Sequence, residues 1–347
     1  MESQNMKNKY ISTIKINKPE ARIIFNKLAT GWRIIAPVEK PGRGRFSDTP
    51  LVDYDFVGSF DDIVFDRMTF YSAKAAVFPI RETLFKIYEG CIKEVECDIT
   101  PTVIFLRACD IHAMQVMDLH FLKDGICSDK YYERLRQRLK IFLIECCESF
   151  ENCYCVSLGT NKSDDYAVFM RKVRDGYEII VKDNEMAEFF PRGGDVVPGP
   201  RAVEKNRRSI NIPEQIPNAI FNEELWKEYS QRCIACGRCN TSCPTCTCFT
   251  MLDIPGSDPA VSERSRIWSS CHVDKFSLLA GGHDFRKENA DRMRYRTLHK
   301  IRDFKRRNGR HMCIGCGRCD DVCPEYISMF YCISKINQAL KDGNHGR

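Results

Sequence analysis

Two copies of one cysteine spacing dominate the chain: Cys233-x2-Cys236-x2-Cys239-x3-Cys243-Pro244 and Cys313-x2-Cys316-x2-Cys319-x3-Cys323-Pro324. Each copy carries a Gly-Arg pair directly before its third cysteine, Gly237-Arg238 in the first and Gly317-Arg318 in the second. The two copies use eight of the 20 cysteines in this 347-residue chain. The duplicated spacing therefore predicts two equivalent sites.

The chemistry of these sites follows from the spacing. Three cysteines at two-residue intervals can bind one iron–sulfur cube from a single turn of backbone, whereas the fourth, before proline, points elsewhere. In two-cluster ferredoxins that fourth cysteine ligates the cluster of the other copy. Zinc is the alternative, but it would favour two CxxC pairs separated by a longer loop. We therefore expect two [4Fe–4S] clusters with exchanged ligands: Cys233, Cys236, Cys239 and Cys323 for cluster 1, and Cys313, Cys316, Cys319 and Cys243 for cluster 2.

The composition is that of a soluble protein. Hydrophobic residues make up 43% and charged residues 29% of the chain, and the length suffices for two domains. The beginning of the chain shows no signal peptide, and no apolar run approaches the ~20 residues that span a bilayer. Because the ferredoxin spacing requires reduced thiols, we expect a cytoplasmic protein without a membrane contact.

The first half of the sequence predicts a mixed α/β domain over residues 1–190. Apolar runs at 102–106 and 141–144 are typical of buried strands, and helical spacing covers 110–122 and 131–138. Two further strands, 166–173 and 177–181, flank Asp175-Gly176, which is a strong hairpin signal.

The second half predicts a different architecture. Residues 191–218, rich in Pro and Gly, read as an irregular linker. Residues 219–347 would then form a mainly helical dicluster domain of the ferredoxin type. Its expected helices are 223–232, 262–276 and 288–304, with no strand between the two cysteine runs. The predicted fold class is α+β.

Five cysteines outside the repeat follow the two predicted N-terminal strands: Cys109, Cys146, Cys147, Cys153 and Cys155. Adjacent parallel strands bring their ends together, so four of these thiols could meet at one place. The functional interpretation is a third cluster held by Cys109, Cys146, Cys153 and Cys155. The alternative is a group of buried free cysteines, which pack as small hydrophobic residues.

The remaining cysteines divide into two groups. Cys246, Cys248 and Cys271 follow the first run closely, but no fourth ligand is evident beside them, which favours core residues next to a cluster. The other four stand alone and are expected to be structural: Cys91, Cys97, Cys127 and Cys332.

Several stretches resemble a family of iron–sulfur electron-transfer proteins, which comprises the A subunits of anaerobic sulfite reductases and the β subunits of sulfhydrogenases. They are Arg107-Ala-Cys-Asp-Ile-His-Ala113, Asp129-Lys-Tyr-Tyr-Glu133, Cys153-Tyr-Cys-Val-Ser157, Cys243-Pro-Thr-Cys-Thr-Cys-Phe249, Trp268-Ser-Ser-Cys271 and Ala280-Gly-Gly-His-Asp-Phe-Arg286. The resemblance runs from about Asp53 to Cys323 and favours the sulfite reductase branch. The family has a cysteine at the position of Cys146 and often another where this chain has Phe150.

The resemblance implies a hetero-oligomer in which a flavin subunit takes electrons from NAD(P)H and this subunit relays them. A third subunit would reduce sulfite to sulfide at sirohaem, in an anaerobic metabolism. The alternative partner is a NiFe sulfhydrogenase, with this chain as the β subunit. Independently, the sequence shows no GxGxxG after a strand, no Walker loop and no nucleophile–base pair, so we expect a non-catalytic relay.

Basic residues crowd the stretch 286–310. An iron–sulfur regulator that binds nucleic acid is one interpretation, since a basic face supplies phosphate affinity. No nucleic-acid module accompanies the charge, however. We expect these residues to offset the negative charge of the clusters or to dock an acidic partner.

Overall fold

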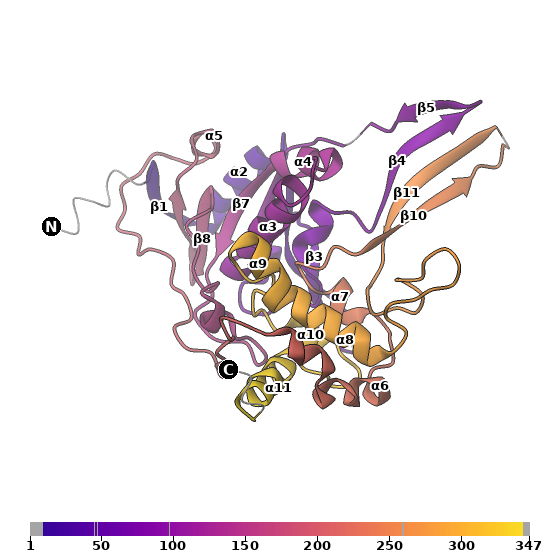
Figure 1. Ribbon diagram of the computed structural model, residues 1–347. Coiled ribbons are helices and arrows are strands. Elements are labelled where there is room, and N and C mark those ends of the chain that lie inside the picture. Colours follow the sequence, from indigo (N-terminus) through magenta and orange to yellow (C-terminus); the bar gives the residue numbers. More distant parts are fainter. Residues whose placement is uncertain (1–9, 45, 47, 97, 259, 343–347) are drawn as a thin grey trace.

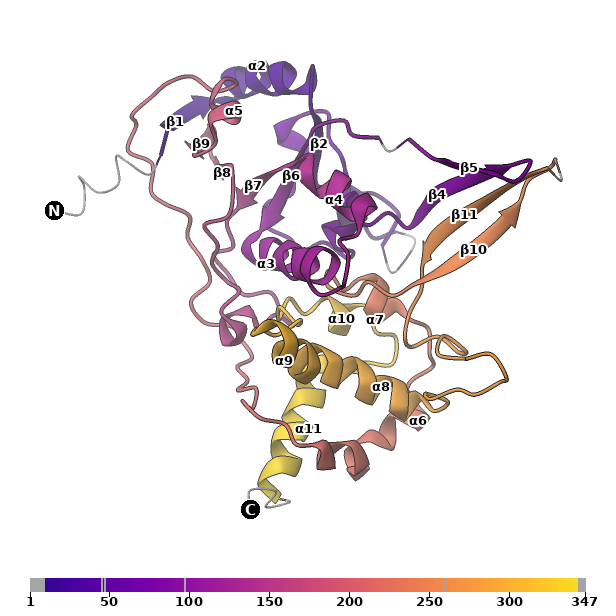
Figure 2. The ribbon, with the colours of Figure 1, turned by 45° about the horizontal axis from the view of Figure 1, so that its top comes forward.

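A computed structural model describes residues 10–342 except Arg45, Ser47, Cys97 and Pro259. Cys97, expected to be structural, thus lies outside the described residues. The structure has an α/β body, a second group of helices beside it and a projecting arm of strands (Figures 1 and 2). The predicted mixed α/β character of the first half is confirmed.

The body is built on a seven-stranded sheet of order β1-β9-β8-β7-β6-β2-β3, in which β2, β6, β7 and β8 are parallel. Its strands are β1 (Ser12–Asn17), β2 (Arg33–Lys40), β3 (Leu51–Phe56), β6 (Thr102–Arg107), β7 (Leu139–Ile144), β8 (Val168–Val173) and β9 (Gly176–Val181). The predicted strands and the β8–β9 hairpin are confirmed.

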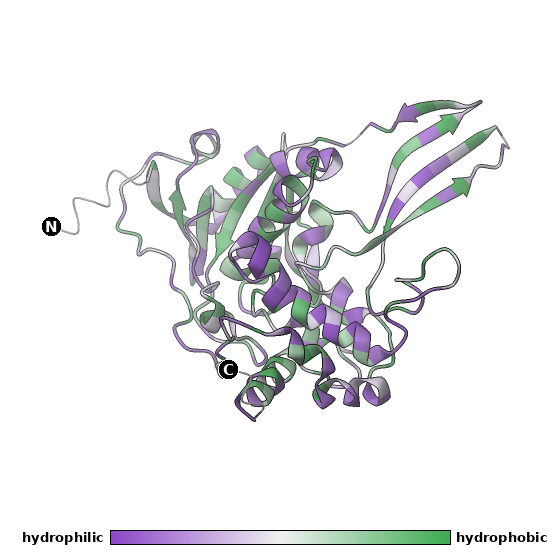
Figure 3. Cartoon of the chain, viewed as in Figure 1, coloured by the Kyte–Doolittle hydropathy of each residue, from purple (hydrophilic) through white to green (hydrophobic). Residues whose placement is uncertain are grey.

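Helices cover both faces of this sheet. Helix α2 (Lys18–Ala29) packs on one face through Ile24, Phe25 and Leu28. Helices α3 (Ala108–Asp118) and α4 (Lys130–Gln137) pack on the other, and a π-type turn extends α3 through Lys123. In Figure 3 the central strands are coloured mainly as hydrophobic residues, whereas the helices mix hydrophilic and hydrophobic residues. The body also contains α5 (Asn184–Ala187). Every residue of β6 is buried, which explains its continuous apolar sequence.

The dicluster region begins after a long irregular segment. Its helices are α6 (Glu228–Arg232), α7 (Arg238–Thr241), α8 (Asn289–Leu298), α9 (Phe304–Asn308), α10 (Arg318–Asp321) and α11 (Met329–Asp342). A π-type turn, His299–Asp303, joins α8 to α9, so the predicted helix over 288–304 is confirmed. These helices enclose an apolar core around Trp226, Tyr229 and Ile333.

The prediction of no strand between the cysteine runs was wrong. Strands β10 (Phe249–Pro255) and β11 (Val261–Trp268) pair as a hairpin, where a helix was expected from 262 onward. Its alternating Arg and Glu residues resemble a helix surface, but here they form cross-strand ion pairs. Arg264 pairs with Asp253, and Arg266 pairs with Glu82.

That hairpin belongs to a second sheet, of order β10-β11-β4-β5, with β4 (Arg81–Tyr88) and β5 (Cys91–Glu94). Residues from the predicted N-terminal domain therefore share one sheet with residues from the predicted dicluster domain. The four strands project as an arm from the body (Figure 1). The domain limits drawn from the sequence stay a prediction.

Candidate iron–sulfur centres

The two cysteine runs have the same local backbone. Ala235 and Gly237 in the first run have left-handed φ angles of 56° and 73°. Gly315 and Gly317, at the matching positions of the second run, have φ angles of 68° and 81°. A one-turn helix follows in each copy, α7 in the first and α10 in the second, and these two helices contact each other. The sequence repeat is thus a structural repeat.

The structure brings the motif cysteines together in two groups. Burial raises the pKa of the Cys233 and Cys239 thiols, and the neighbouring thiols of Cys236 and Cys323 raise it further. Cys323, from the second run, therefore lies beside the first three cysteines. This is the first of the two groups expected from exchanged ligands.

The second group mirrors the first. Burial raises the pKa of Cys313, Cys316 and Cys319, and the Cys243 thiol raises the pKa of each one further. Cys243 itself, 8% exposed, comes from the first run. The grouping agrees with the predicted exchange, while the role of each thiol as a ligand stays a prediction.

Two buried cations lie between these groups on adjacent turns of one helical stretch. Arg296 is 4% exposed and interacts electrostatically with Cys239 and Cys319, one from each run. Lys300 is 3% exposed, and its Nζ donates a hydrogen bond to Thr245 Oγ1 at 2.9 Å. Burial alone would lower the pKa of Lys300, but the thiols of Cys243 and Cys246 raise it above the ordinary lysine value.

The surroundings of these two cations show whether an anionic cluster would fit between them. Within the described residues, Arg296 Nη2 is buried and has no hydrogen-bond partner, and no carboxylate pairs with Arg296 or Lys300. Unpaired buried cations are costly, so an anionic group between them would be stabilising. Four-thiolate iron–sulfur clusters are anions of this kind. The side chains therefore fit the clusters that the motif predicts.

No three His, Cys, Asp or Glu side chains of the described residues form a site for a single metal ion. Zinc, the alternative from the sequence, needs four ligands close to one ion. A [4Fe–4S] cube is larger and takes its ligands farther apart.

The N-terminal cysteines also gather, at the ends of β6 and β7. Cys109, Cys153 and Cys155 are 6%, 3% and 4% exposed and pack in one buried group with Ile314 and Cys316. Cys146 lies next to this group, since the Cys153 thiol contributes to the raised pKa that burial gives Cys146. Cys147 is exposed. Phe150, where relatives often have cysteine, packs against the same group.

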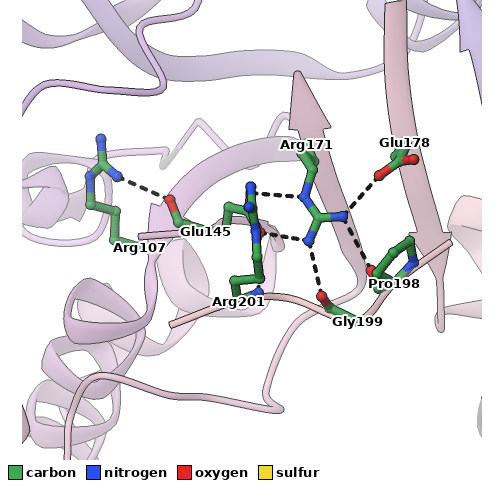
Figure 4. A network of polar contacts seen from close by, with 7 residues as sticks. All are labelled: Arg107, Glu145, Arg171, Glu178, Pro198, Gly199 and Arg201. Carbon is green, nitrogen blue, oxygen red and sulfur yellow. Dashed lines mark hydrogen bonds and ion pairs between the residues drawn. The ribbon is translucent and has the colours of Figure 1, made fainter. Parts of the chain in front are cut away.

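A polar network fixes the strand ends next to Cys146 (Figure 4). Both Glu145 carboxylate oxygens accept hydrogen bonds from Arg171, at 2.8 and 2.7 Å, and Arg201 binds the same carboxylate. Arg171 also donates to Gly199 O at 3.0 Å, which holds the linker against the sheet. Burial alone would raise the pKa of Glu145, but the two arginines lower it to about 2.

A buried ion pair joins the N-terminal group to the second cysteine run. Arg318 donates to both oxygens of Asp110, at 2.6 and 2.8 Å, and the two side chains are 1% and 2% exposed. Asp110 follows Cys109 in sequence, and Arg318 lies between Cys316 and Cys319. Arg238, at the matching place in the first run, is exposed. Sequence reasoning missed this pair because the two arginines look equivalent.

The remaining cysteines are placed as follows. Cys332 is fully buried in α11, whereas Cys91 and Cys127 are exposed. Cys246 and Cys271 contact the buried side chain of Asn240, and Cys248 is hydrogen-bonded to Cys271. Lys74, a buried cation that the sequence did not single out, donates to the backbone oxygens of Asn240 and Cys246. Burial lowers the pKa of Lys74 to about 8, although the nearby thiols of Cys246 and Cys243 act to raise it.

Four basic residues of the stretch 286–310 are buried and therefore unavailable to nucleic acid. Arg292, Arg296, Lys300 and Arg302 are each at most 9% exposed. The interpretation as charge compensation for clusters accounts for the two cations that interact electrostatically with motif cysteines, Arg296 and Lys300. In the part of the chain that the structure describes, no helix has the length and apolar character needed to cross a membrane.

Comparison with known proteins places these groups in context. Residues 232–327, which contain all eight motif cysteines, match the 4Fe-4S dicluster domain family. Across 94% of its length the chain is 28% identical to sulfhydrogenase 2 subunit beta of Pyrococcus furiosus, of which it covers 99%. A shorter match, 24% identical, joins 40% of the chain to 27% of the F420-dependent formate dehydrogenase subunit beta of Methanocaldococcus jannaschii. No solved structure matches the chain.

Both relatives are named as subunits of oxidoreductases, and sulfite reductase is not among the matches. The findings therefore support the sulfhydrogenase alternative better than the sulfite reductase reading. The chain carries a 4Fe-4S dicluster domain in a mixed α/β protein, as expected for an iron–sulfur electron-transfer subunit.

Proposed function

We propose that this chain relays electrons within a multi-subunit oxidoreductase of the sulfhydrogenase type, as its β subunit. The observation that carries the proposal is the grouping of eight motif cysteines into two sets around Arg296 and Lys300. In this proposal Cys233, Cys236, Cys239 and Cys323 hold cluster 1, and Cys313, Cys316, Cys319 and Cys243 hold cluster 2. The likeness to a sulfhydrogenase β subunit over nearly the whole chain supports the choice of complex.

The clusters would supply one-electron redox chemistry at potentials set by charge, hydrogen bonding and exposure. The chain's own residues control each of these. Arg296 and Lys300 place positive charge between the two groups, which stabilises added electrons. The Tyr154 hydroxyl lies 3.3 Å from Cys313 Sγ, within hydrogen-bonding distance of a cluster 2 ligand. Burial of Cys243 and Cys316 limits water at the same cluster.

A third cluster, held by Cys109, Cys146, Cys153 and Cys155, extends the proposed relay into the α/β body. Its support is the burial of three of these thiols in one group that also contains Cys316 of cluster 2. The contact between the two sites would suit transfer from one to the other. The Arg318–Asp110 ion pair fixes their relative position.

The proposed partners are a flavin subunit that exchanges electrons with NAD(P)H and a catalytic hydrogenase subunit. We do not propose a sirohaem sulfite reductase as the partner, because none of the matched proteins carries that name. The arm formed by β4, β5, β10 and β11 has no counterpart in the mainly helical domain expected from the sequence, and it projects away from the body (Figure 2). The cytoplasmic location stays a prediction.

The proposal is tested by recovering the complex from native cells through a tag on this chain, under anaerobic conditions. The purified assembly is assayed for hydrogen-dependent reduction of NAD(P)+ and for NAD(P)H-dependent reduction of sulfite. We expect the first activity, with hydrogenase and flavin subunits present. Recovery with a sirohaem protein, and with sulfite reduction as the sole activity, would show that the sulfite reductase reading is right.

A further inference from the structure

The two cysteine runs differ in what covers them, although their spacing and local backbone are the same. In the second run Ile314 is 2% exposed and Cys316 is 7% exposed. At the matching positions of the first run, Ile234 is 58% exposed and Cys236 is also exposed. One copy of the motif is thus enclosed by the protein, whereas the other copy faces solvent.

Residues of the α/β body cover the second run. Thr160 Oγ1 donates a hydrogen bond to Ile314 O at 2.6 Å, and the Tyr154 N–H donates to Gly315 O at 2.8 Å. A Cβ at Gly315 would lie only 2.8 Å from Tyr154 O, so this close approach of two backbones requires glycine. The first run has Ala235 at the matching position, and its Cβ could not fit under a backbone at that distance.

The same difference extends to charge. Arg318, in the second run, is buried and donates to both carboxylate oxygens of Asp110, which the body supplies. Arg238, at the matching position of the first run, is exposed, and no carboxylate of the described residues forms an ion pair with it. The motif arginine of the first run therefore presents its positive charge to solvent.

An exposed aromatic side chain lies beside the same cysteine group. Tyr326 is 77% exposed, and its N–H donates to Cys323 O at 3.2 Å, next to the cysteine that the second run contributes to the first group. Arg232 Nη2 donates to Glu325 O at 3.1 Å, which joins this turn to the start of the first run. We define the first-run face as the exposed residues Ile234, Cys236, Arg238 and Tyr326.

The chemistry of this face indicates what would bind to it. Exposed Arg and Tyr beside an aliphatic residue are typical of the centre of a protein–protein interface. A second copy of this chain, docked face to face about a twofold axis, would bring two Arg238 guanidinium groups together, and like charges repel. A partner with a carboxylate would instead supply what Asp110 supplies to Arg318.

Exposure also decides where electrons can cross to another protein. Of the eight motif cysteines, all of which lie within the described residues, only Cys236 is exposed. Cys236 belongs to the group proposed to hold cluster 1, so that cluster would lie closest to a docked partner. Cluster 2 would lie under the cover that Tyr154 and Thr160 provide.

We propose that the first-run face is the docking surface for an acidic redox subunit that exchanges electrons with cluster 1. The partner places a carboxylate on Arg238, as Asp110 lies on Arg318, and an apolar surface over Ile234 and Tyr326. One electron crosses this contact at a time, so that the partner's redox centre is oxidised as cluster 1 is reduced, or the reverse. The inference rests on the proposed electron-transfer function and names the place where electrons enter or leave the chain.

Cross-linking within the native complex tests the proposal. Arg238→Lys keeps the positive charge and supplies an amine that a carbodiimide couples to a carboxylate in direct contact. The complex is recovered without oxygen through a tag on this chain, treated with the carbodiimide and analysed by mass spectrometry. We expect a bond from position 238 to an Asp or Glu of another redox subunit. Coupling only within this chain or to a second copy of it, or no coupling at all, would overturn the proposal.

The matched control is Arg174, an exposed arginine on the turn between β8 and β9. Arg174→Lys introduces the same amine on the α/β body, and we expect no bond from it to the redox subunit that position 238 reaches. A bond from both positions to the same carboxylates would show that the coupling is unspecific and would count against the first-run face.

Charge reversal provides a second readout that does not depend on cross-linking. Arg238→Glu should raise the apparent Kd between this chain and the rest of the complex about 30-fold or more, because it replaces an interface ion pair by repulsion. Arg174→Glu should leave the Kd unchanged. Equal Kd values in the two variants would contradict the proposal. Failure of the proposed function gives a different result, because the wild-type complex would then contain no second redox subunit.

Discussion

Replacing Arg318 with methionine should destabilise the protein far more than the same change at Arg238, its counterpart in the repeat. The Arg318 guanidinium makes two hydrogen bonds to Asp110, and its Nε and Nη2 donate to Thr69 as well. In Arg318→Met the Asp110 carboxylate, 2% exposed, loses its only cationic partner among the described ion pairs. Breaking a buried pair in this way costs about 3–5 kcal/mol.

The size of the effect on thermal unfolding follows from the length of the chain. An unfolding entropy of about 2.1 cal/mol/K per residue, applied to the whole chain, converts that cost into a fall in Tm of roughly 4–7 °C. Arg238→Met changes an exposed side chain and should cost less than about 0.5 kcal/mol. Circular dichroism during anaerobic heating measures both variants.

The double variant Arg318→Met/Asp110→Asn separates charge pairing from packing. Removing both charges leaves no unpaired carboxylate, so the double variant should be more stable than Arg318→Met alone. Equal losses in Arg318→Met and Arg238→Met would refute the reasoning. The reasoning would also be refuted if the double variant lost as much stability as Arg318→Met and Asp110→Asn lose when measured separately and added together.

Three further predictions address the clusters and the polar network. Cys243→Ala should perturb the spectrum of the cluster held by the second run and leave the cluster of Cys233, Cys236 and Cys239 intact; the reverse pattern would rule out ligand exchange. Lys300→Met removes a buried positive charge and should make at least one potential more negative, whereas Lys305→Met, whose cation pairs with the exposed Glu214, should change none. Glu145→Gln should cost about 3 kcal/mol at pH 7, because the folded-state pKa lies near 2 and the ordinary value is 4.5. Since a depressed pKa stabilises the fold above the unfolded value, urea unfolding should show this deficit shrinking as the pH falls from about 4.5 towards 2, and a constant deficit would contradict the assignment.

Local patterns in the sequence were sufficient to predict strands and helices of the α/β body. The apolar run at 102–106 and the helical spacing after Asp110 describe elements whose residues are nearly all buried, so their pattern reflects one dominant environment. Their order also predicts that Cys109 and Cys146 follow neighbouring strands, and β6 and β7 are parallel neighbours.

The arm could not be predicted from local patterns. Strand β11 pairs with β4, whose sequence lies far from it along the chain, and Glu263 and Arg266 form ion pairs with residues of β4. Without the partner strand, Glu263, Arg264 and Arg266 read as a solvated helix.

The candidate sites show the same division. The grouping of the motif cysteines could be predicted from their spacing, because the same spacing occurs twice in the sequence. The buried cations could not be predicted from the sequence. Lys74, for example, belongs to a short turn that is remote in sequence from the cysteines that it faces. Arg318 and Arg238 occupy equivalent motif positions, and only the packing of α10 against the body makes one of them buried.

The measurement that tests the central claim most directly is a reductive titration of the full-length chain, purified without oxygen and followed by electron paramagnetic resonance. We predict at least two one-electron reductions per chain, about eight or more irons with matching sulfide, and signals broadened by interaction between neighbouring clusters. A chain that folds but contains stoichiometric zinc and little iron, and that takes up no electrons, would contradict the account.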